Sequence, residues 1–169
     1  TERLFASQAA TQKQRLEAER EQDDEHDLKA GERIWRAAKE LDAVEALAAL
    51  TFARFGVVHF LHFHAGGLNA DADWSSFKTP LPDWNKALDG GFRGTLHGVR
   101  AFVPRMLAQA PAPGKIVASS AVAGLLDTAP ETGVPHVVAM HAVTLLFDAL
   151  AAELRQITQA AHLKVHLFH

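Results

Sequence analysis

The chain has 169 residues, of which 48% are hydrophobic and 22% are charged, and its formal net charge is -3. This length suits one domain with a sizeable core, and the charge excludes the basic surface that nucleic acid requires. The absence of cysteine excludes disulfides, zinc–thiolate sites and thiol nucleophiles. We find no signal peptide and no apolar run long enough to span a bilayer, so we expect a cytoplasmic protein with no membrane partner.

Residues 1–40 predict a charged helical segment. The stretch TQKQRLEAEREQDDEHDLKAGERIWRAAKE combines helix-forming residues with opposite charges three and four positions apart, a spacing typical of an exposed helix. Gly31 is the expected break within it. The sequence opens on Thr1 rather than methionine, which is consistent with a processed or incomplete chain. We expect residues 41–169 to form the folded domain.

That domain is predicted to begin with a helix over residues 42–54. The segment DAVEALAALTFAR carries an apolar stripe that includes Val44, Leu47 and Leu50. Gly56 follows and is expected to end the helix.

Three short runs rich in β-branched and aromatic residues predict buried strands, and two longer segments between them predict helices. The strands are VVHFLHFH at 57–64, KIVASS at 115–120 and LKVHLF at 163–168; the helices cover 82–109, with a break expected near Gly90-Gly91, and 134–158. Strands that alternate with long helices imply βαβ units. We therefore predict an α/β fold with a partial doubly wound, Rossmann-like parallel sheet, whose ligands would gather beyond the carboxyl ends of the strands.

Four segments between Val44 and His169 resemble, in their order and spacing, the later part of a short-chain dehydrogenase/reductase. They are ARFGVVHFLHFHAGG, DWNKALDGGFRGTLHGVRAFVPRML, GKIVASSAVAGL and MHAVTLLFDALAAELR. Members of that family are doubly wound oxidoreductases that move a hydride between NAD(P) and an alcohol or carbonyl. The resemblance implies the same fold for this domain.

The catalytic positions of the family hold different residues in this sequence. In the family a tyrosine is the acid/base, a lysine lowers the pKa of that tyrosine and holds the nicotinamide ribose, a serine steadies the substrate oxygen, and an asparagine holds a proton-relay water. The resemblance places these positions at His136, Met140, Ala121 and Gly91 respectively, with Ser120 next to the serine position. Of these residues only His136 could titrate near neutral pH, and a buried structural histidine is the commoner case on an apolar helix.

The sequence also lacks the glycine-rich turn with which the family holds the pyrophosphate, because no G-x-x-x-G-x-G occurs in it. We therefore expect no bound cofactor, or NAD or NADP if the sequence is incomplete or misread. The family also associates through two long helices, which correspond here to residues 92–109 and 134–155. Since the second of these is apolar nearly all round, the resemblance implies a homodimer or tetramer.

The leading hypothesis is a noncatalytic short-chain dehydrogenase/reductase-like domain that acts through self-association. The first alternative is an NAD(P)-dependent oxidoreductase acting on an alcohol or carbonyl substrate, which requires that the sequence be incomplete or misread. A nucleophilic role for Ser119 or Ser120 is the weakest alternative, because the sequence has no G-x-S-x-G turn.

A further alternative is a histidine-rich metal-binding domain. The sequence holds ten histidines, and imidazole is a good ligand for zinc, copper and nickel. His62 and His64 are two positions apart on a predicted strand and therefore share a face, while the family layout brings His136 and His169 toward one end of the sheet. No H-E-x-x-H motif is present, so the expectation from the sequence is no metal site.

Overall fold

The computed structural model describes residues 40–64, 75–122, 125 and 133–169. The predicted charged helical segment, with its break at Gly31, lies almost wholly outside the described residues. One compact unit spans Ala37–His169. The division of the chain into residues 1–40 and 41–169 stays a prediction.

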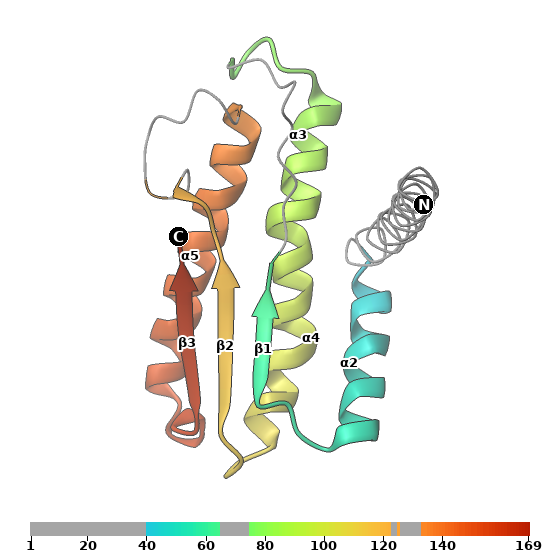
Figure 1. The fold of residues 1–169 in the computed structure, drawn as a ribbon, viewed down its shortest axis with the longest axis vertical. Coiled ribbons are helices and arrows are strands. Elements are labelled where there is room, and N and C mark those ends of the chain that lie inside the picture. The colour runs from blue at the N-terminus through green and yellow to red at the C-terminus, as the bar shows by residue number, and fades with distance from the viewer. Residues whose placement is uncertain (1–39, 65–74, 123–124, 126–132) are drawn as a thin grey trace, which may run out of the picture. The chain divides into compact units, whose positions relative to one another are not determined.

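The described part of the chain contains a three-stranded parallel sheet. Its strands are β1 (Phe60–Phe63), β2 (Gly114–Ser119) and β3 (Leu163–Phe168), and they lie in the order β1-β2-β3 (Figure 1). The register places Leu61 opposite Ile116 and Ile116 opposite Val165. Consecutive parallel strands side by side, joined by helices, are the predicted α/β Rossmann-like arrangement, and this prediction is confirmed.

Helices α4 (Gly94–Ala108) and α5 (Val134–Gln156) cover one face of the sheet (Figure 1). Between that face and the two helices lies the core, and its largest fully buried apolar side chains are Phe147, Met106, Ile116 and Val143. The α5 helix runs back along β3, so its N-terminus lies near the carboxyl ends of the strands (Figure 1). The fold therefore brings the first turns of α5 to the edge of the sheet where ligands of such folds gather.

Helix α2 (Leu41–Phe55) packs against α4 through a second, smaller core. Val44 and Ala48 are buried there, and the Phe52 and Phe102 rings lie 6.3 Å apart. The predicted stripe was wrong for Leu47 and Leu50, which are 56% and 65% exposed. The contact uses positions four residues apart, which form a single row on a helix, and the two leucines lie beside that row. As predicted, the helix ends at Gly56, whose positive φ of 76° suits glycine.

The break predicted near Gly90-Gly91 is instead a π-helical turn. Helix α3 (Leu81–Ala87), the π-turn η1 (Leu88–Arg93) and α4 follow one another without interruption. The N–H of Gly94 donates to the carbonyl of Asp89, five residues earlier. Gly90 and Gly91 are buried, and η1 packs against α5. Two residues without side chains let the two helices come close at this point.

Strand β1 is shorter than predicted, because the chain before it bonds to a side chain instead of a neighbouring strand. The Gln109 side chain accepts a hydrogen bond from the Val58 N–H at 3.0 Å and donates one to the Val58 carbonyl at 3.0 Å. Both backbone groups of Val58 are therefore satisfied outside the sheet, and regular pairing begins two residues later.

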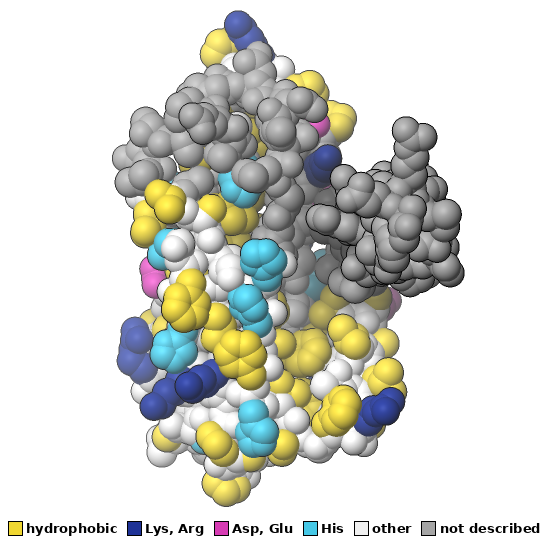
Figure 2. All heavy atoms as spheres, viewed as in Figure 1, with side chains coloured by type: hydrophobic (Ala, Val, Ile, Leu, Met, Phe, Trp, Pro, Cys, Tyr) yellow, Lys and Arg dark blue, Asp and Glu magenta, His cyan; other side chains and the backbone are white. Residues whose placement is uncertain are grey.

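The other face of the sheet carries none of the described helices (Figure 1). Parallel sheets are usually covered on both faces. Histidine and hydrophobic side chains gather on this open face, over the strands (Figure 2). It includes Phe60 and Phe168, both 60% exposed, and the exposed His62 and His166.

Helix α5 is long and apolar enough to cross a membrane by length and composition, so the expectation that no such run exists was wrong. The core helix of a folded domain passes the same test, because it too must be apolar on most sides. In this chain nine residues of α5 are buried within the described domain.

Candidate functional site

Three of the segments that carry the predicted site residues come together beside the first turns of α5. Met140 lies on α5, Gly91 lies on η1, and Ser120 directly follows β2. A Cβ atom on Gly91 would lie 3.1 Å from the Met140 methyl carbon. Ser120 Oγ lies 3.5 Å from the Met140 carbonyl oxygen. The structure thus brings these three positions together around Met140, and His136 lies one helical turn earlier on α5.

The space beside Gly91 is filled by apolar atoms. In addition to the Met140 methyl, the Ala139 Cβ would lie 3.2 Å from a Cβ on Gly91. Such distances are tighter than ordinary van der Waals contact, so a side chain at position 91 would have to displace Met140. Met140 itself is 3% exposed, and Ala121 packs against the same core. The residues that the resemblance assigns to the lysine and asparagine positions therefore supply a packed thioether side chain and a glycine, with no charged side chain.

Ser120 follows β2 and forms hydrogen bonds to both β3 and α5. Its N–H donates to the Phe168 carbonyl on β3 at 2.7 Å. Its Oγ reaches the Met140 carbonyl on α5, and Thr144 Oγ1 lies 3.4 Å away. Thr144 Oγ1 also donates to the Met140 carbonyl at 3.1 Å. The hydroxyl of Ser120 is therefore engaged with the Met140 carbonyl and the Thr144 hydroxyl, instead of being held by a base that could activate it as a nucleophile.

His136 is buried in the first turn of α5, with 7% of its surface exposed. Its Nε2 has no hydrogen-bond partner within the part of the chain that the structure describes. Burial lowers the pKa of His136 below the ordinary histidine value of 6.5, since the charged imidazolium is poorly solvated there. The imidazole is therefore held neutral at pH 7.

Replacing His136 by leucine is expected to stabilise the domain and to flatten its pH dependence. The variant loses the buried Nε2, for which the described part of the chain offers no partner, and we expect this loss to raise the free energy of unfolding by about 1 kcal/mol at neutral pH. In the unfolded chain His136 titrates near 6.5, above its folded pKa. As pH falls below 6.5 the unfolded state binds more protons, so the wild type loses stability until pH reaches the folded pKa. Urea unfolding between about pH 7.5 and 5 measures the difference.

The control for this experiment is His166→Gln, since His166 is exposed on β3. Its free energy of unfolding at pH 7.5 should stay within about 0.5 kcal/mol of the wild-type value, because the change affects an exposed side chain. If the free energy of unfolding depended on pH equally in the wild type and in the His136→Leu variant, a neutral buried imidazole at this position would be contradicted.

The remaining predicted ligands do not gather into one site. Among the described residues, no group of three or more histidines or carboxylates could hold a metal ion. His62 and His64 lie on the open face of the sheet, with ring centroids 5.9 Å apart, and His62 Nε2 lies 2.7 Å from Ser119 Oγ. His169 is exposed at the end of the chain.

Sequence reasoning missed two hydroxyls that organise this region. Thr95 is 2% exposed and donates to the Gly91 carbonyl at 2.7 Å. Thr144 donates to the Met140 carbonyl, as described above. Each threonine lies four residues after its acceptor, and this spacing, which lets a hydroxyl bond back to the preceding helical turn, is the signal that could have identified both.

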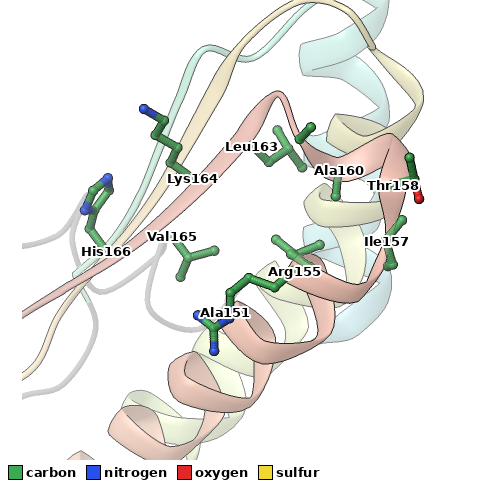
Figure 3. A pocket seen from close by; sticks show the side chains of 11 residues that line it. Ala151, Arg155, Ile157, Thr158, Ala160, Leu163, Lys164, Val165 and His166 are labelled. Carbon is green, nitrogen blue, oxygen red and sulfur yellow. The ribbon is translucent and has the colours of Figure 1, made fainter.

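A hollow of about 520 Å³ lies between the end of α5 and the start of β3 (Figure 3), at the opposite end of α5 from Met140. Arg155 and Val165 point into the space between the helix and the strand, whereas Lys164 and His166 point to the other side of the strand (Figure 3). The three basic side chains therefore do not converge on one ligand, and the hollow is separate from the residues around Met140.

Comparison with known proteins assigns the chain to a family. Residues 9–161 match the short chain dehydrogenase family. The chain belongs to that family. A Mycobacterium tuberculosis protein named as oxidoreductase SadH is 36% identical over 88 residues, which are 52% of this chain and 30% of that protein.

Solved structures agree with this assignment. A short-chain dehydrogenase/reductase from Burkholderia phymatum, in complex with NAD, is 32% identical, with a TM-score of 0.67 over 77% of this chain and 43% of that one. An NAD+-bound xylitol dehydrogenase shares the fold at 22% identity, with a TM-score of 0.66 over 77% of this chain and 46% of that one. The chain thus spans less than half the length of these relatives. It is a short-chain dehydrogenase-like domain, as the resemblance predicted.

The described residues do not fit the nicotinamide ribose that this family holds beside α5. A ribose needs hydrogen-bond partners for its hydroxyls. Position 140 offers a buried thioether, and position 91 offers no side chain. His136 Nε2, which has no hydrogen-bond partner in the described ranges, is buried, where it cannot meet a ligand without rearrangement.

Proposed function

We propose that this short-chain dehydrogenase-like domain has no reductase chemistry of its own and acts by associating with a second copy of the chain. The loss of chemistry rests on one observation, the packing of Met140 against Gly91. General acid/base work on an alcohol needs a titratable group at the reacting atoms and a charge to tune it. Here the space beside Gly91 is filled by the methyl groups of Met140 and Ala139, and the hydroxyls of Thr95 and Ser120 bond to backbone carbonyls.

Association is supported by apolar side chains on the outer side of α5. Val138 and Leu145 are 40% and 68% exposed. They are seven residues apart, which places them nearly in line along the helix. A leucine exposed to this degree gains about 1–2 kcal/mol when a partner covers it. The family resemblance points to this helix and α4 as the contact between subunits.

Leu145→Glu is the variant that tests association. A buried glutamate in an apolar contact between subunits would be strongly unfavourable, so we expect the dissociation constant of the dimer to rise at least about tenfold. Sedimentation velocity over a range of chain concentrations measures the change. The matched control is Leu50→Glu. Leu50 is 65% exposed, like Leu145, but it lies on α2, so the change leaves the side chains of α4 and α5 unaltered.

The Leu50→Glu variant should associate like the wild type. If the wild type is a monomer at every concentration, or if both variants behave alike, association through α5 is wrong. Neither result would bear on the loss of reductase chemistry, which is tested separately.

The second candidate is an NAD(P)-dependent oxidoreductase, and family membership and the NAD-bound Burkholderia phymatum relative favour it. Titration of the chain with NADH and NADPH, followed by the fluorescence of the reduced nicotinamide, separates the two proposals. We expect no saturable binding in the micromolar range. Saturable binding, or oxidation of an alcohol with reduction of either coenzyme, would replace the first proposal by the second.

A further inference from the structure

Two histidines lie side by side on the open face of the sheet, at the carboxyl end of β1. His62 and His64 are separated by Phe63, whose ring points the other way and packs edge-on against Phe147, with centroids 5.8 Å apart. Because alternate residues of a strand share a face, the partly buried Phe63, packed against the core, fixes both histidines on the open side. Both are exposed, and their ring centroids are 5.9 Å apart.

We propose that His62 and His64 together chelate a divalent late transition metal, with copper(II) bound most tightly and water filling the remaining positions. Two imidazoles bound to one ion at ~2.0–2.1 Å place their ring centres roughly 5 Å apart. The observed separation is within about 1 Å of that geometry, which small side-chain rotations supply. Imidazole suits copper, nickel and zinc, and affinity follows the order in which copper(II) is highest.

Ser119 on the neighbouring strand orients the first of these ligands. Its Oγ lies 2.7 Å from His62 Nε2. When Ser119 accepts a hydrogen bond from Nε2–H, the proton is held on that nitrogen and the lone pair of Nδ1 is left for the metal. Hydrogen bonds of this kind, from a ligand's second nitrogen to a neighbouring group, fix the ring of metal-binding histidines. The site is therefore a chelate with one ligand already held in place.

His166 does not belong to this site, although it is exposed on the same face. It pairs in register with Val117, which pairs in turn with His62. One strand, β2, lies between these histidines, and two strand spacings put their backbones roughly 9.6 Å apart, so they cannot readily share one ion. The site is distinct from the residues around Met140, and it does not depend on the proposed function.

The test is a calorimetric titration of the full, untagged chain with copper(II) buffered by glycine, together with electron paramagnetic resonance of the bound copper. We expect one site of higher affinity with nitrogen hyperfine structure. His62→Ala and His64→Ala should each weaken it at least about tenfold, since each removes one arm of the chelate. His166→Ala should bind as the wild type does, and calcium should not compete.

The variants change exposed side chains, and circular dichroism will show that each one folds. His62→Gln, which retains a partner for Ser119, should lose the site like His62→Ala. Copper affinity unchanged in both His62→Ala and His64→Ala would overturn the proposal. An equal loss in His166→Ala would also overturn it, because binding would then be spread over the face. The proposal would also be overturned if the wild type bound copper no more tightly than the double variant His62→Ala/His64→Ala.

Discussion

Replacing Phe147 by alanine is expected to lower the free energy of unfolding by about 3–5 kcal/mol. The ring is 1% exposed, packs edge-on against Phe63 and belongs to the main core between α5 and the sheet. Alanine would leave a cavity that β1 and α5 cannot both close. Because small domains are stable by only about 5–15 kcal/mol, a large part of the population should unfold at moderate temperature. Chemical denaturation followed by circular dichroism measures the loss.

The control for Phe147 is Leu145→Ala on the same helix, where the side chain is 68% exposed. Under conditions in which the chain is monomeric, this change should alter the free energy of unfolding by less than about 0.5 kcal/mol. A similar loss in both variants would mean that α5 is buried on a different side.

Gly98→Ala is expected to destabilise the domain, although alanine is the better helix former. In an exposed helix this change would stabilise by about 1 kcal/mol. Here the added Cβ would lie 2.2 Å from Cε1 of Phe63 and 3.1 Å from two other atoms of that ring. The ring must move, and it is held by its contact with Phe147. We expect a net loss of about 1–3 kcal/mol in the free energy of unfolding, measured by urea denaturation.

A double-mutant cycle with Phe63→Leu checks the cause. Leucine lacks the ring atoms that the new Cβ would meet, so Gly98→Ala should cost much less, or even stabilise, in that background. Equal costs in the two backgrounds would show that the close approach of α4 to β1 is not responsible.

Much of the fold follows from local pattern. The sequence predicts β2 and β3 to within one residue at each end, because β-branched runs bounded by proline, glycine or helix ends are short-range signals. Helix α5 is predicted with its first residue correct, since Gly133 and, two residues later, Pro135 stand at the start of a long apolar segment. The parallel order of the strands then follows from the alternation of strands and helices.

Features that depend on distant contacts could not be predicted. Strand β1 begins late because Gln109, which is 51 residues from Val58, bonds to its backbone. Leu47 and Leu50 fit a helical stripe, yet α4 contacts the neighbouring row through Val44 and Ala48. In each case two arrangements satisfy the local pattern, and a contact far along the chain selects one of them.

For the candidate site too, the sequence predicts the positions of residues along the chain but not the packing around them. The resemblance assigns residues 91, 121 and 140 to family positions, because the motifs fix them along the chain. The packing around these residues could not be predicted from the sequence, since the contact of the Met140 methyl with Gly91 exists only once η1 and α5 are packed. The sequence likewise shows a histidine at 136 but cannot show that its Nε2 is buried with no hydrogen-bond partner among the described residues.

The π-turn at Leu88–Arg93 has a consequence for how homologous sequences are compared. One extra residue in a helix rotates everything on one side of it by about 100° relative to an uninterrupted α-helix. Side chains of α3 and α4 that appear to be in phase when counted at 3.6 residues per turn therefore point in different directions. A relative that lacks one residue in this turn would need a one-residue gap in its alignment. Deleting one of the two glycines in this turn would rotate α3 relative to α4 and so change its contact with α5, although every other side chain would be kept.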